Sequence, residues 1–488
     1  MAVSILYLGE GKSQLRPLSE RALYHFSLDR SFSRICNDVK KTKYFLSLVS
    51  EMTDSKDEIM YRQEVIRDFE NNPELLEQLV SLSSRFEELR VSQKTADKEK
   101  YRLNNTGAMS SVASKNILQT QAICLKRALL FIKAYGELLA EFELKSRGLT
   151  ELYTACREIY ENPDFSRLIL FCSKYENFSS SGFWNFRFSL NDEGYLEKYE
   201  LIDHRYIHIS DPDLKKKGFS IFKKTEEISH PCERLSPIKD GLFENLSIFA
   251  LSDISRLFGN ISEQIFTKFG LIDKELVFYE IALKYIEALS EKKVPICYPI
   301  FTENQGVRVK NLYDIYLLMS KPEPTHVIPH DFAIEQGRRG LLVFGNNGSG
   351  KTVYLRSIGT MQILAQAGLP IPCESAQLEL FKQIATQFSE SEKEFCDGND
   401  AGRFEQEVRE LAKLVDTLKE DSIVFLNETF QSTAYAEGSD CLYHLLNHFS
   451  ALNIRWILVT HLRQLEEMFS EDEISILHII NFKQNQFL

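Results

Sequence analysis

A short apolar run that leads directly into a glycine-rich loop constrains the fold of this chain more than any other feature. The run is Leu341–Phe344, and its composition is typical of a buried central strand. The loop is Gly345–Thr352, whose sequence GNNGSGKT fits the pattern G-x-x-x-x-G-K followed by Ser or Thr. A helical pattern then continues over Val353–Ala367. A strand, a tight loop and a helix in this order predict an α/β domain with a phosphate-binding loop.

The chemistry of this loop predicts that ATP is bound together with Mg²⁺. Glycines allow the backbone to wrap tightly, so that its N–H groups can point at phosphate oxygens. Lys351 is expected to reach the β- and γ-phosphates and to balance charge during hydrolysis, and Thr352 to offer its hydroxyl to Mg²⁺. A chance glycine-rich turn is the alternative, and the flanking strand and helix argue against it. The predicted nucleotide-binding residues are Gly345, Asn346, Asn347, Gly348, Ser349, Gly350, Lys351, Thr352 and Val353.

Two further predicted strands end in polar residues. Ile423–Leu426 is followed by Asn427 and Glu428, and Arg455–Val459 leads to His461. P-loop ATPases usually place an acid for Mg²⁺ and then a glutamate that orients water after such a strand. We therefore predict that Glu428 is catalytic and that Asn427 lies beside the metal, where its amide accepts a hydrogen bond but brings no negative charge. His461 is the third predicted catalytic residue, as a sensor of the γ-phosphate, and a purely structural histidine is the alternative.

The rest of the chain is predicted to be mainly helical. Apolar residues recur at spacings of three and four in Pro73–Leu89, Ile117–Leu144 and Asp253–Leu289, which predicts long packed helices. Trp184–Leu190 and Tyr206–Ile209 instead alternate apolar with polar residues, which predicts short strands. His444 and His448 share one face of a predicted helix, but no third metal ligand is evident, so a surface or core pair is favoured.

Composition limits the possible partners and compartments. The formal net charge of -12 argues against a chain that wraps nucleic acid along its whole surface. The chain contains no run of about 20 apolar residues, so no membrane span is predicted. Nine cysteines without a Cys-x-x-Cys pair indicate reduced thiols of a cytoplasmic protein. The best local basic patch, which is either a solvated loop or a phosphate contact, holds Lys215, Lys216, Lys217, Lys223 and Lys224 around Phe219 and Phe222.

These motifs together resemble one known family. Gly345–Tyr354, reading GNNGSGKTVY, is similar to the phosphate-binding loop of the MutS DNA mismatch-repair ATPases. The similarity is strong over Asn311–Phe469, and Tyr61–Leu76 and Glu275–Ile300 look less specifically like the family's helical core and lever. A serine is expected at the start of the signature helix, where this chain has Gly402. Further matches are Arg356, Gly368–Pro372, Glu374–Ala376, Phe404, Glu407, Asn427–Thr433 and Ile457–His461.

The resemblance implies a multidomain fold. It consists of a mostly α-helical core and lever region with a small mixed α/β clamp-like part, followed by a doubly wound α/β P-loop ATPase domain of the ABC type. The family's N-terminal mismatch-reading domain is expected to be absent, because the helical pattern begins almost at once. The implied segments are a helical core over 1–177, a clamp-like segment over 178–250, lever helices over 251–305 and the ATPase domain over 306–488.

The resemblance also implies a function. It points to an ATP-dependent DNA-binding protein of repair or recombination that acts on branched, mismatched or otherwise structured duplex. In a homodimer, each ATPase domain would complete the other's nucleotide site with its Gly402–Glu405 helix start. Because few residues follow His461, the helix-turn-helix that completes dimerisation in fuller members is expected to be absent, which makes the homodimer less secure.

Two alternatives stay open. The first is an ATP-gated binding module with little or no hydrolysis, suggested by Asn427 and the missing signature serine. The second is another ABC-type chromosome-maintenance ATPase. The short stretch between Lys351 and Glu428 argues against it, because it holds no coiled coil.

Overall fold

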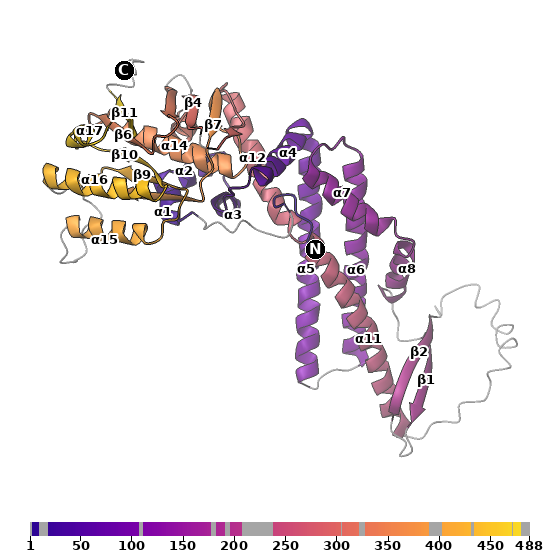
Figure 1. The fold of residues 1–488 in the computed structure, drawn as a ribbon. Helices are drawn as coiled ribbons and strands as arrows, with labels where there is room; N and C mark the ends of the chain where they lie inside the picture. The colour runs from indigo at the N-terminus through magenta and orange to yellow at the C-terminus, as the bar shows by residue number, and fades with distance from the viewer. Residues whose placement is uncertain are drawn as a thin grey trace. The chain divides into compact units, whose positions relative to one another are not determined.

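The computed structural model describes residues 2–8, 18–106, 111–176, 182–190, 196–206, 238–303, 305–321, 327–389, 403–430, 434–470 and 472–479. They belong to two compact units, which we describe separately (Figure 1). The first unit comprises Met1–Val3, Glu77–Glu143 and Glu151–Asp273. The second comprises Ser4–Leu76, Leu144–Thr150 and Lys274–Leu488. Among the residues with a described position, no helix combines the length and apolar character needed to cross a bilayer.

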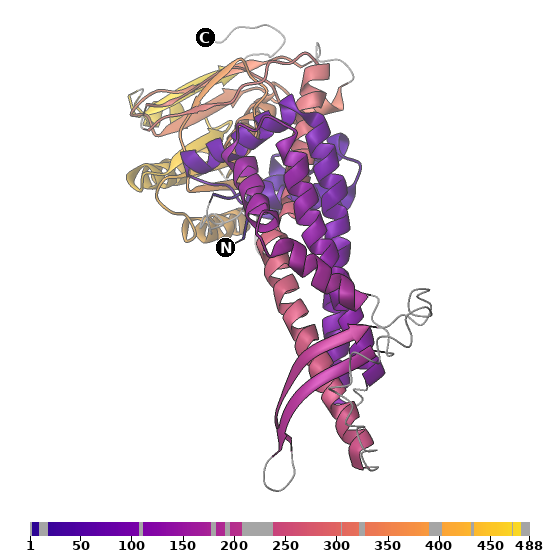
Figure 2. The same cartoon turned by 90° about the vertical axis from the view of Figure 1, so that its right-hand side faces the viewer.

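The first unit is a bundle of long helices with one hairpin (Figure 2). Its core is aromatic: Phe86 packs against Phe266 with ring centroids 5.0 Å apart, and Phe258 packs against Phe171 at 5.4 Å. Helices are present where the periodicity predicts them, but their ends differ: α5 runs past Leu89, α6 ends at Ala140 before the predicted Leu144, and the stretch Asp253–Leu289 is divided between two helices that break after Phe269. The elements are α5 (Pro73–Asn105), α6 (Ser111–Ala140), α7 (Arg147–Tyr160), α8 (Phe165–Glu176), β1 (Gly182–Leu190), β2 (Leu196–Tyr206) and α11 (Ile238–Phe269).

The second strand of the hairpin corrects one sequence prediction. β1 agrees with the strand expected at Trp184–Leu190, but its partner runs over Leu196–Tyr206 and ends where the second strand was expected to begin. Residues 207–209 lie outside the described part. The antiparallel register pairs Leu190, the last residue of β1, with Leu196, so the second strand follows β1 closely. Charged residues between the apolar ones hide the alternation in this segment.

The second unit is built around a parallel sheet whose two faces are both covered. Leu342, Val424 and Leu458 lie in one core cluster together with residues of α16. Their neighbours along each strand point to the other face, which is covered by α14. The sheet has the order β11-β6-β10-β9-β8, with every pair parallel. Its strands are β6 (Gly340–Gly345), β8 (Gln383–Phe388), β9 (Ser422–Asn427), β10 (Arg455–Val459) and β11 (Ile474–Ile479).

A smaller mixed sheet and several helices complete this unit. The sheet has the order β3-β7-β4-β5 and contains both parallel and antiparallel pairs. Its strands are β3 (Ile300–Phe301), β4 (Val307–Leu312), β5 (His330–Ile334) and β7 (Ser375–Leu378). The helices are α12 (Ile272–Glu291), α13 (Ile315–Ser320), α14 (Lys351–Gln366), α15 (Arg403–Val415), α16 (Tyr435–Ala451) and α17 (Gln464–Met468).

The first helices of the chain belong to the same unit as the parallel sheet. They are α1 (Glu20–His25), α2 (Leu28–Ile35), α3 (Val39–Ser50) and α4 (Lys56–Asn71), and their grouping differs from the segment 1–177 expected from the sequence. Side chains of Ser19, Asp38 and Ser55 cap α1, α3 and α4. Phe26 explains the grouping, because its ring fills the space beside Gly359 of α14. A β-carbon at that glycine would lie 2.0 Å from the ring.

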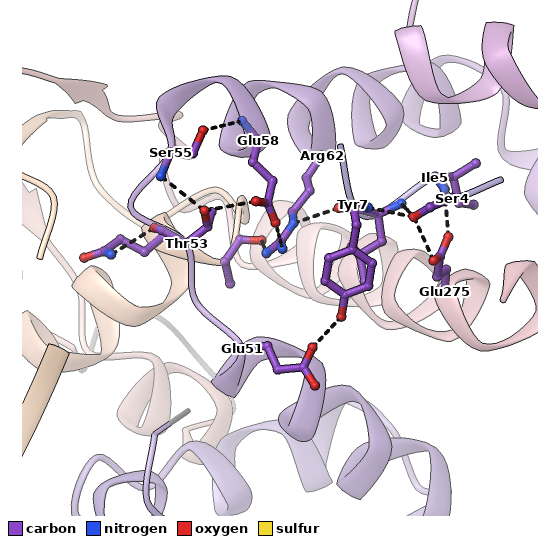
Figure 3. Close-up of polar contacts among 12 residues, drawn as sticks. Ser4, Ile5, Tyr7, Glu51, Thr53, Ser55, Glu58, Arg62 and Glu275 are labelled. Carbon is purple, nitrogen blue, oxygen red and sulfur yellow. Dashed lines mark hydrogen bonds and ion pairs between the residues drawn. The ribbon is translucent and has the colours of Figure 1, made fainter. Parts of the chain in front are cut away.

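A buried polar network fixes α4 to the N-terminal segment and to α14 (Figure 3). The guanidinium of Arg62 pairs with Glu58 and donates to the carbonyl of Leu6 at 3.0 Å and that of Ala367 at 3.3 Å. On α12, the carboxylate of Glu275 accepts hydrogen bonds from Ser4 Oγ at 2.8 Å and from the N–H of Ile5 at 2.7 Å. Burial raises the pKa of Glu275 to about 7, against the opposing effect of these hydrogen bonds.

We predict that Glu275 makes the second unit less stable as pH rises. Its pKa in the folded state lies above the ordinary value of 4.5, so its contribution is fully present below that value and is lost as pH rises through about 7. The free energy of unfolding of the wild type, compared with Glu275→Gln, should fall by on the order of 2–3 kcal/mol between about pH 5 and pH 8. Urea unfolding at several pH values measures this difference.

Glu280 on the same helix provides the matched control. Although burial opposes them, hydrogen bonds from Lys284 and Lys41 lower its pKa. Its contribution is therefore complete above the ordinary carboxyl value, and the Glu280→Gln difference should be flat over the same range. A difference for Glu275→Gln that does not change with pH would contradict the prediction.

Candidate functional site

The glycine-rich loop spans the turn from β6 to α14, and its glycines are required by the backbone. Gly348 and Gly350 have φ angles of 76° and 101°, a region that residues with a β-carbon rarely adopt. At Gly345 a β-carbon would lie 2.6 Å from the carbonyl oxygen of Ile479. The loop can therefore keep this tight path only with glycine at these three positions.

The start of α14 offers unsatisfied donors to a ligand. Its N-cap is Gly350, which has no side chain to cap the first turn, whereas Asp314 caps the nearby α13. The hydroxyl of Ser349 is buried and has no hydrogen-bond partner among the described residues. Uncapped N–H groups at a helix N-terminus favour an anion, so this arrangement fits the phosphates of a nucleotide.

The buried ammonium group of Lys351 lies against the backbone of the loop. Its side chain is only 4% exposed, and its Nζ donates to the carbonyl oxygens of Gly345 at 2.9 Å and Asn346 at 3.2 Å. Burial lowers the pKa of Lys351, while the nearby Glu428 opposes that change. The ammonium group is thus held close to the place where the loop would take up phosphate.

The structure brings the predicted residues from the ends of β9 and β10 to this loop. Glu428 Oε1 lies 4.0 Å from Lys351 Nζ and 3.2 Å from His461 Nε2, and that histidine nitrogen lies 3.2 Å from Lys351 Nζ. Asn427 Oδ1 accepts a hydrogen bond from Thr352 Oγ1 at 3.5 Å. The proposed metal-binding oxygens and the three proposed catalytic groups therefore share one edge of the sheet.

The chain is sharply bent directly after β9. Glu428 and Phe430 have φ angles of 57° and 61°, which are unusual for residues other than glycine. The N–H of Glu428 donates to the carbonyl of Val459 at 2.8 Å, which ties the bend to β10. Positive φ values that cluster beside a ligand site indicate a backbone held by its surroundings for the position of a side chain.

Glu407 of α15 supports this bend and was assigned no role from the sequence. It is buried, and its carboxylate accepts hydrogen bonds from the N–H of Phe430 at 2.9 Å and from Ser389 Oγ at 3.3 Å. It thereby connects α15, the end of β8 and the bend after Glu428. The only sequence signal was an acid on the predicted signature helix, and its partner lies far away in the chain.

Several other predicted residues do not join this site or cannot be placed. His444 and His448 lie on exposed positions of α16, and the described residues contain no group of three or more potential metal ligands. Gly402, Gln431–Thr433 and the lysine patch Lys215–Lys224 lie outside the described residues. The contribution of a signature helix start therefore rests on the sequence alone.

Comparison with known proteins gives consistent matches to MutS and MutS2 proteins. The family model of MutS domain V matches residues 341–487. DNA mismatch repair protein MutS of Chlorobium phaeovibrioides is 27% identical over 183 residues, which cover 37% of this chain and 20% of that protein. Endonuclease MutS2 of Streptococcus mutans is 27% identical over 176 residues, or 36% and 21% of the two chains.

A longer match includes part of the helical region. DNA mismatch repair protein MutS of Symbiobacterium thermophilum is 25% identical over 277 residues, which cover 56% of this chain and 28% of that protein. The chain thus spans between a fifth and somewhat more than a quarter of the length of these relatives. The resemblance first seen in the motifs is confirmed: residues 341–487 match MutS domain V, and the chain is similar to MutS and MutS2 proteins.

Proposed function

We propose that this protein binds ATP with Mg²⁺, hydrolyses it, and uses that cycle to control its hold on DNA in repair or recombination. One observation carries the proposal: Lys351, Glu428 and His461 meet within 4.0 Å beside the uncapped start of α14. A cation, a carboxylate and an imidazole at the end of a phosphate-binding loop are suited to nucleotide hydrolysis.

Each residue has a distinct role in this proposal. Thr352 and Asn427 would hold Mg²⁺, since both offer oxygen atoms, which hard cations prefer. Lys351 and the N–H groups of the loop would hold negative charge, and Glu428 would orient and polarise the attacking water. His461 would hold Glu428 in position and respond to the γ-phosphate. When bound, Mg²⁺–ATP supplies the phosphoryl group that is transferred to water.

The DNA-binding part of the proposal rests on the family. The relatives bear the names mismatch repair protein and endonuclease, so the comparisons support a role in DNA repair or recombination without selecting one DNA structure. We propose structured duplex as the ligand and a homodimer as the active form, in which a second copy would add the start of its α15 to the site.

One alternative is an ATP-gated binding module with little or no hydrolysis. Asn427 favours it, because a neutral amide replaces the acid that such sites usually place beside the metal. The pairing of Glu428 with His461 also favours it, since that contact competes with water for the carboxylate. The two functions differ in turnover and share nucleotide binding.

We predict that Glu428→Gln separates binding from turnover. The variant should bind ATP with nearly wild-type affinity and lose about 10²-fold or more of kcat, because the amide orients and polarises water poorly. Lys351→Ala should instead weaken ATP binding roughly 10- to 100-fold, since it removes a charge-assisted contact of about 1.5–3 kcal/mol. Equilibrium titration with a fluorescent ATP analogue and phosphate release, with and without DNA, measure both quantities.

Glu467 on α17 is exposed, and Glu467→Gln is the matched control that should change neither quantity. Wild-type turnover in Glu428→Gln would remove Glu428 from its proposed role. A wild-type protein that binds ATP but releases no phosphate above background, with any DNA tested, would favour the binding module.

We predict that Asn427→Asp raises the affinity for Mg²⁺ roughly tenfold, because a carboxylate is a stronger ligand of hard cations than an amide. Thr352 Oγ1 lies 3.5 Å from Asn427 Oδ1, so the new charge would be close to the proposed metal. Nucleotide binding at graded Mg²⁺ concentrations measures the effect. Asn447→Asp on α16 is the control, and an equal response of both variants would contradict a metal role for residue 427.

We also predict DNA binding that is salt-sensitive and depends on the lysine patch. Each lysine that neutralises a phosphate releases counterions, which contributes about -0.9 to the slope of log affinity against log salt on duplex DNA. Replacing Lys215, Lys216 and Lys217 together by Ala should weaken binding to a labelled junction and make the slope shallower. Unchanged affinity and slope would show that the patch is a solvated loop without phosphate contacts. The DNA-binding surface would then be sought at Lys94–Arg102 on α5.

A further inference from the structure

Cys297 and Cys373 lie far apart in the sequence but next to each other in the second unit. Cys297 follows α12, and Cys373 follows α14. An isolated antiparallel bridge joins Cys297 to Ile371, with N–H to carbonyl hydrogen bonds of 2.9 Å in both directions. The backbone itself therefore holds the two segments together.

A tight turn then brings Cys373 back toward Cys297. The N–H of Cys373 donates to the carbonyl of Ile371 at 3.0 Å, a three-residue turn that the fixed φ of Pro372 favours. The carbonyl of Pro372 accepts from the N–H of Tyr313 at 3.0 Å, which fixes the turn against its neighbour. This arrangement brings the side chains of Cys297 and Cys373 next to each other, where each thiol affects the pKa of the other.

The two thiols differ in exposure and in acidity. Cys297 is partly exposed, whereas Cys373 is completely buried. The neighbouring thiol of Cys373 and a hydrogen bond from the N–H of Ala376 lower the pKa of Cys297 to about 7, against the effect of burial. The same thiol–thiol contact and burial raise the pKa of Cys373. A partly exposed thiolate beside a buried thiol is the arrangement in which one cysteine attacks and the other resolves.

We propose that Cys297 and Cys373 form a reversible disulfide, in which Cys297 reacts first with a low-molecular-weight disulfide such as oxidised glutathione and Cys373 resolves the product. The Cys297 thiolate attacks one sulfur of glutathione disulfide and releases one glutathione thiolate, which leaves a mixed disulfide. Cys373 gives up its proton, attacks the Cys297 sulfur and releases the second glutathione. Two protein thiols are oxidised and one glutathione disulfide is reduced to two thiols.

The position of this bond would give it a structural consequence. The chain between the two cysteines contains β3, β4, α13, β5, β6, the glycine-rich loop and α14. A disulfide would close this stretch into a covalent ring and restrict the unfolded chain. It would tie the segment that enters the α/β core to the segment that leaves α14. This proposal concerns the two cysteines and stands whether or not the nucleotide is hydrolysed.

The test uses the full chain in glutathione buffers of graded ratio, followed by alkylation of free thiols and peptide mass mapping. The wild type should yield a peptide pair joined through Cys297 and Cys373, and reduction should reverse it. Cys373→Ser should instead accumulate a stable glutathione adduct on Cys297, because the resolving thiol is missing. Cys297→Ser should leave Cys373 unmodified, because that thiol is buried and poorly ionised.

Cys441 supplies the matched control, since it is an exposed free cysteine on α16. Cys441→Ser should form the Cys297–Cys373 bond at the same glutathione ratio as the wild type. Absence of the joined peptides under oxidising buffer, or an adduct on Cys373 in Cys297→Ser, would overturn the proposal. The oxidised wild type should also melt a few degrees higher than the reduced form, while oxidised Cys373→Ser should not. Equal melting temperatures for the oxidised and reduced wild type would contradict the proposed structural consequence of the disulfide.

Discussion

The parallel pairing of β6, β10 and β9 is the constraint on which the candidate site depends. The register places Val343 opposite Val459, and Val459 opposite Asn427. Because parallel strands end at the same edge, the glycine-rich loop, Glu428 and His461 must emerge there together. Two backbone hydrogen bonds continue the pairing beyond the strands, from Glu428 to Val459 and from Thr460 to Val343. The functional groups thus inherit their spacing from the sheet.

Helix α14 connects this edge to the rest of the second unit. Its N-terminus presents uncapped N–H groups to the loop, and the buried guanidinium of Arg62 donates to the carbonyl of Ala367 at the other end. A cation at a helix C-terminus complements the helix dipole as an anion does at the N-terminus. Arg62 is itself paired with Glu58, and removal of one partner would leave a buried charge uncompensated. The N-terminal helices are therefore part of the same unit as the candidate site.

The sequence predicts features that are local and misses those that depend on distant partners. The strands that end near Gly345, Asn427 and His461 are recognisable because an apolar run meets a glycine or polar residue within a few positions. The sequence does not show that α1 to α4 pack in the same unit as the parallel sheet. Their apolar faces indicate only that they are buried, and the contact of Phe26 with Gly359 determines which element they pack against. For the same reason, no pattern in the chain could have paired Glu407 with the bend after β9, or Cys297 with Cys373.

The charges at the site bear on how binding and hydrolysis are related. Lys351 and Glu428 carry opposite charges 4.0 Å apart, and Asn427 adds no charge beside them. An aspartate at position 427 would add a negative charge that repels the phosphates until a metal neutralises it. The amide removes that repulsion and at the same time weakens the metal's anchor. If the proposed function is correct, this exchange makes nucleotide binding less dependent on Mg²⁺ and leaves hydrolysis as the step that the metal controls.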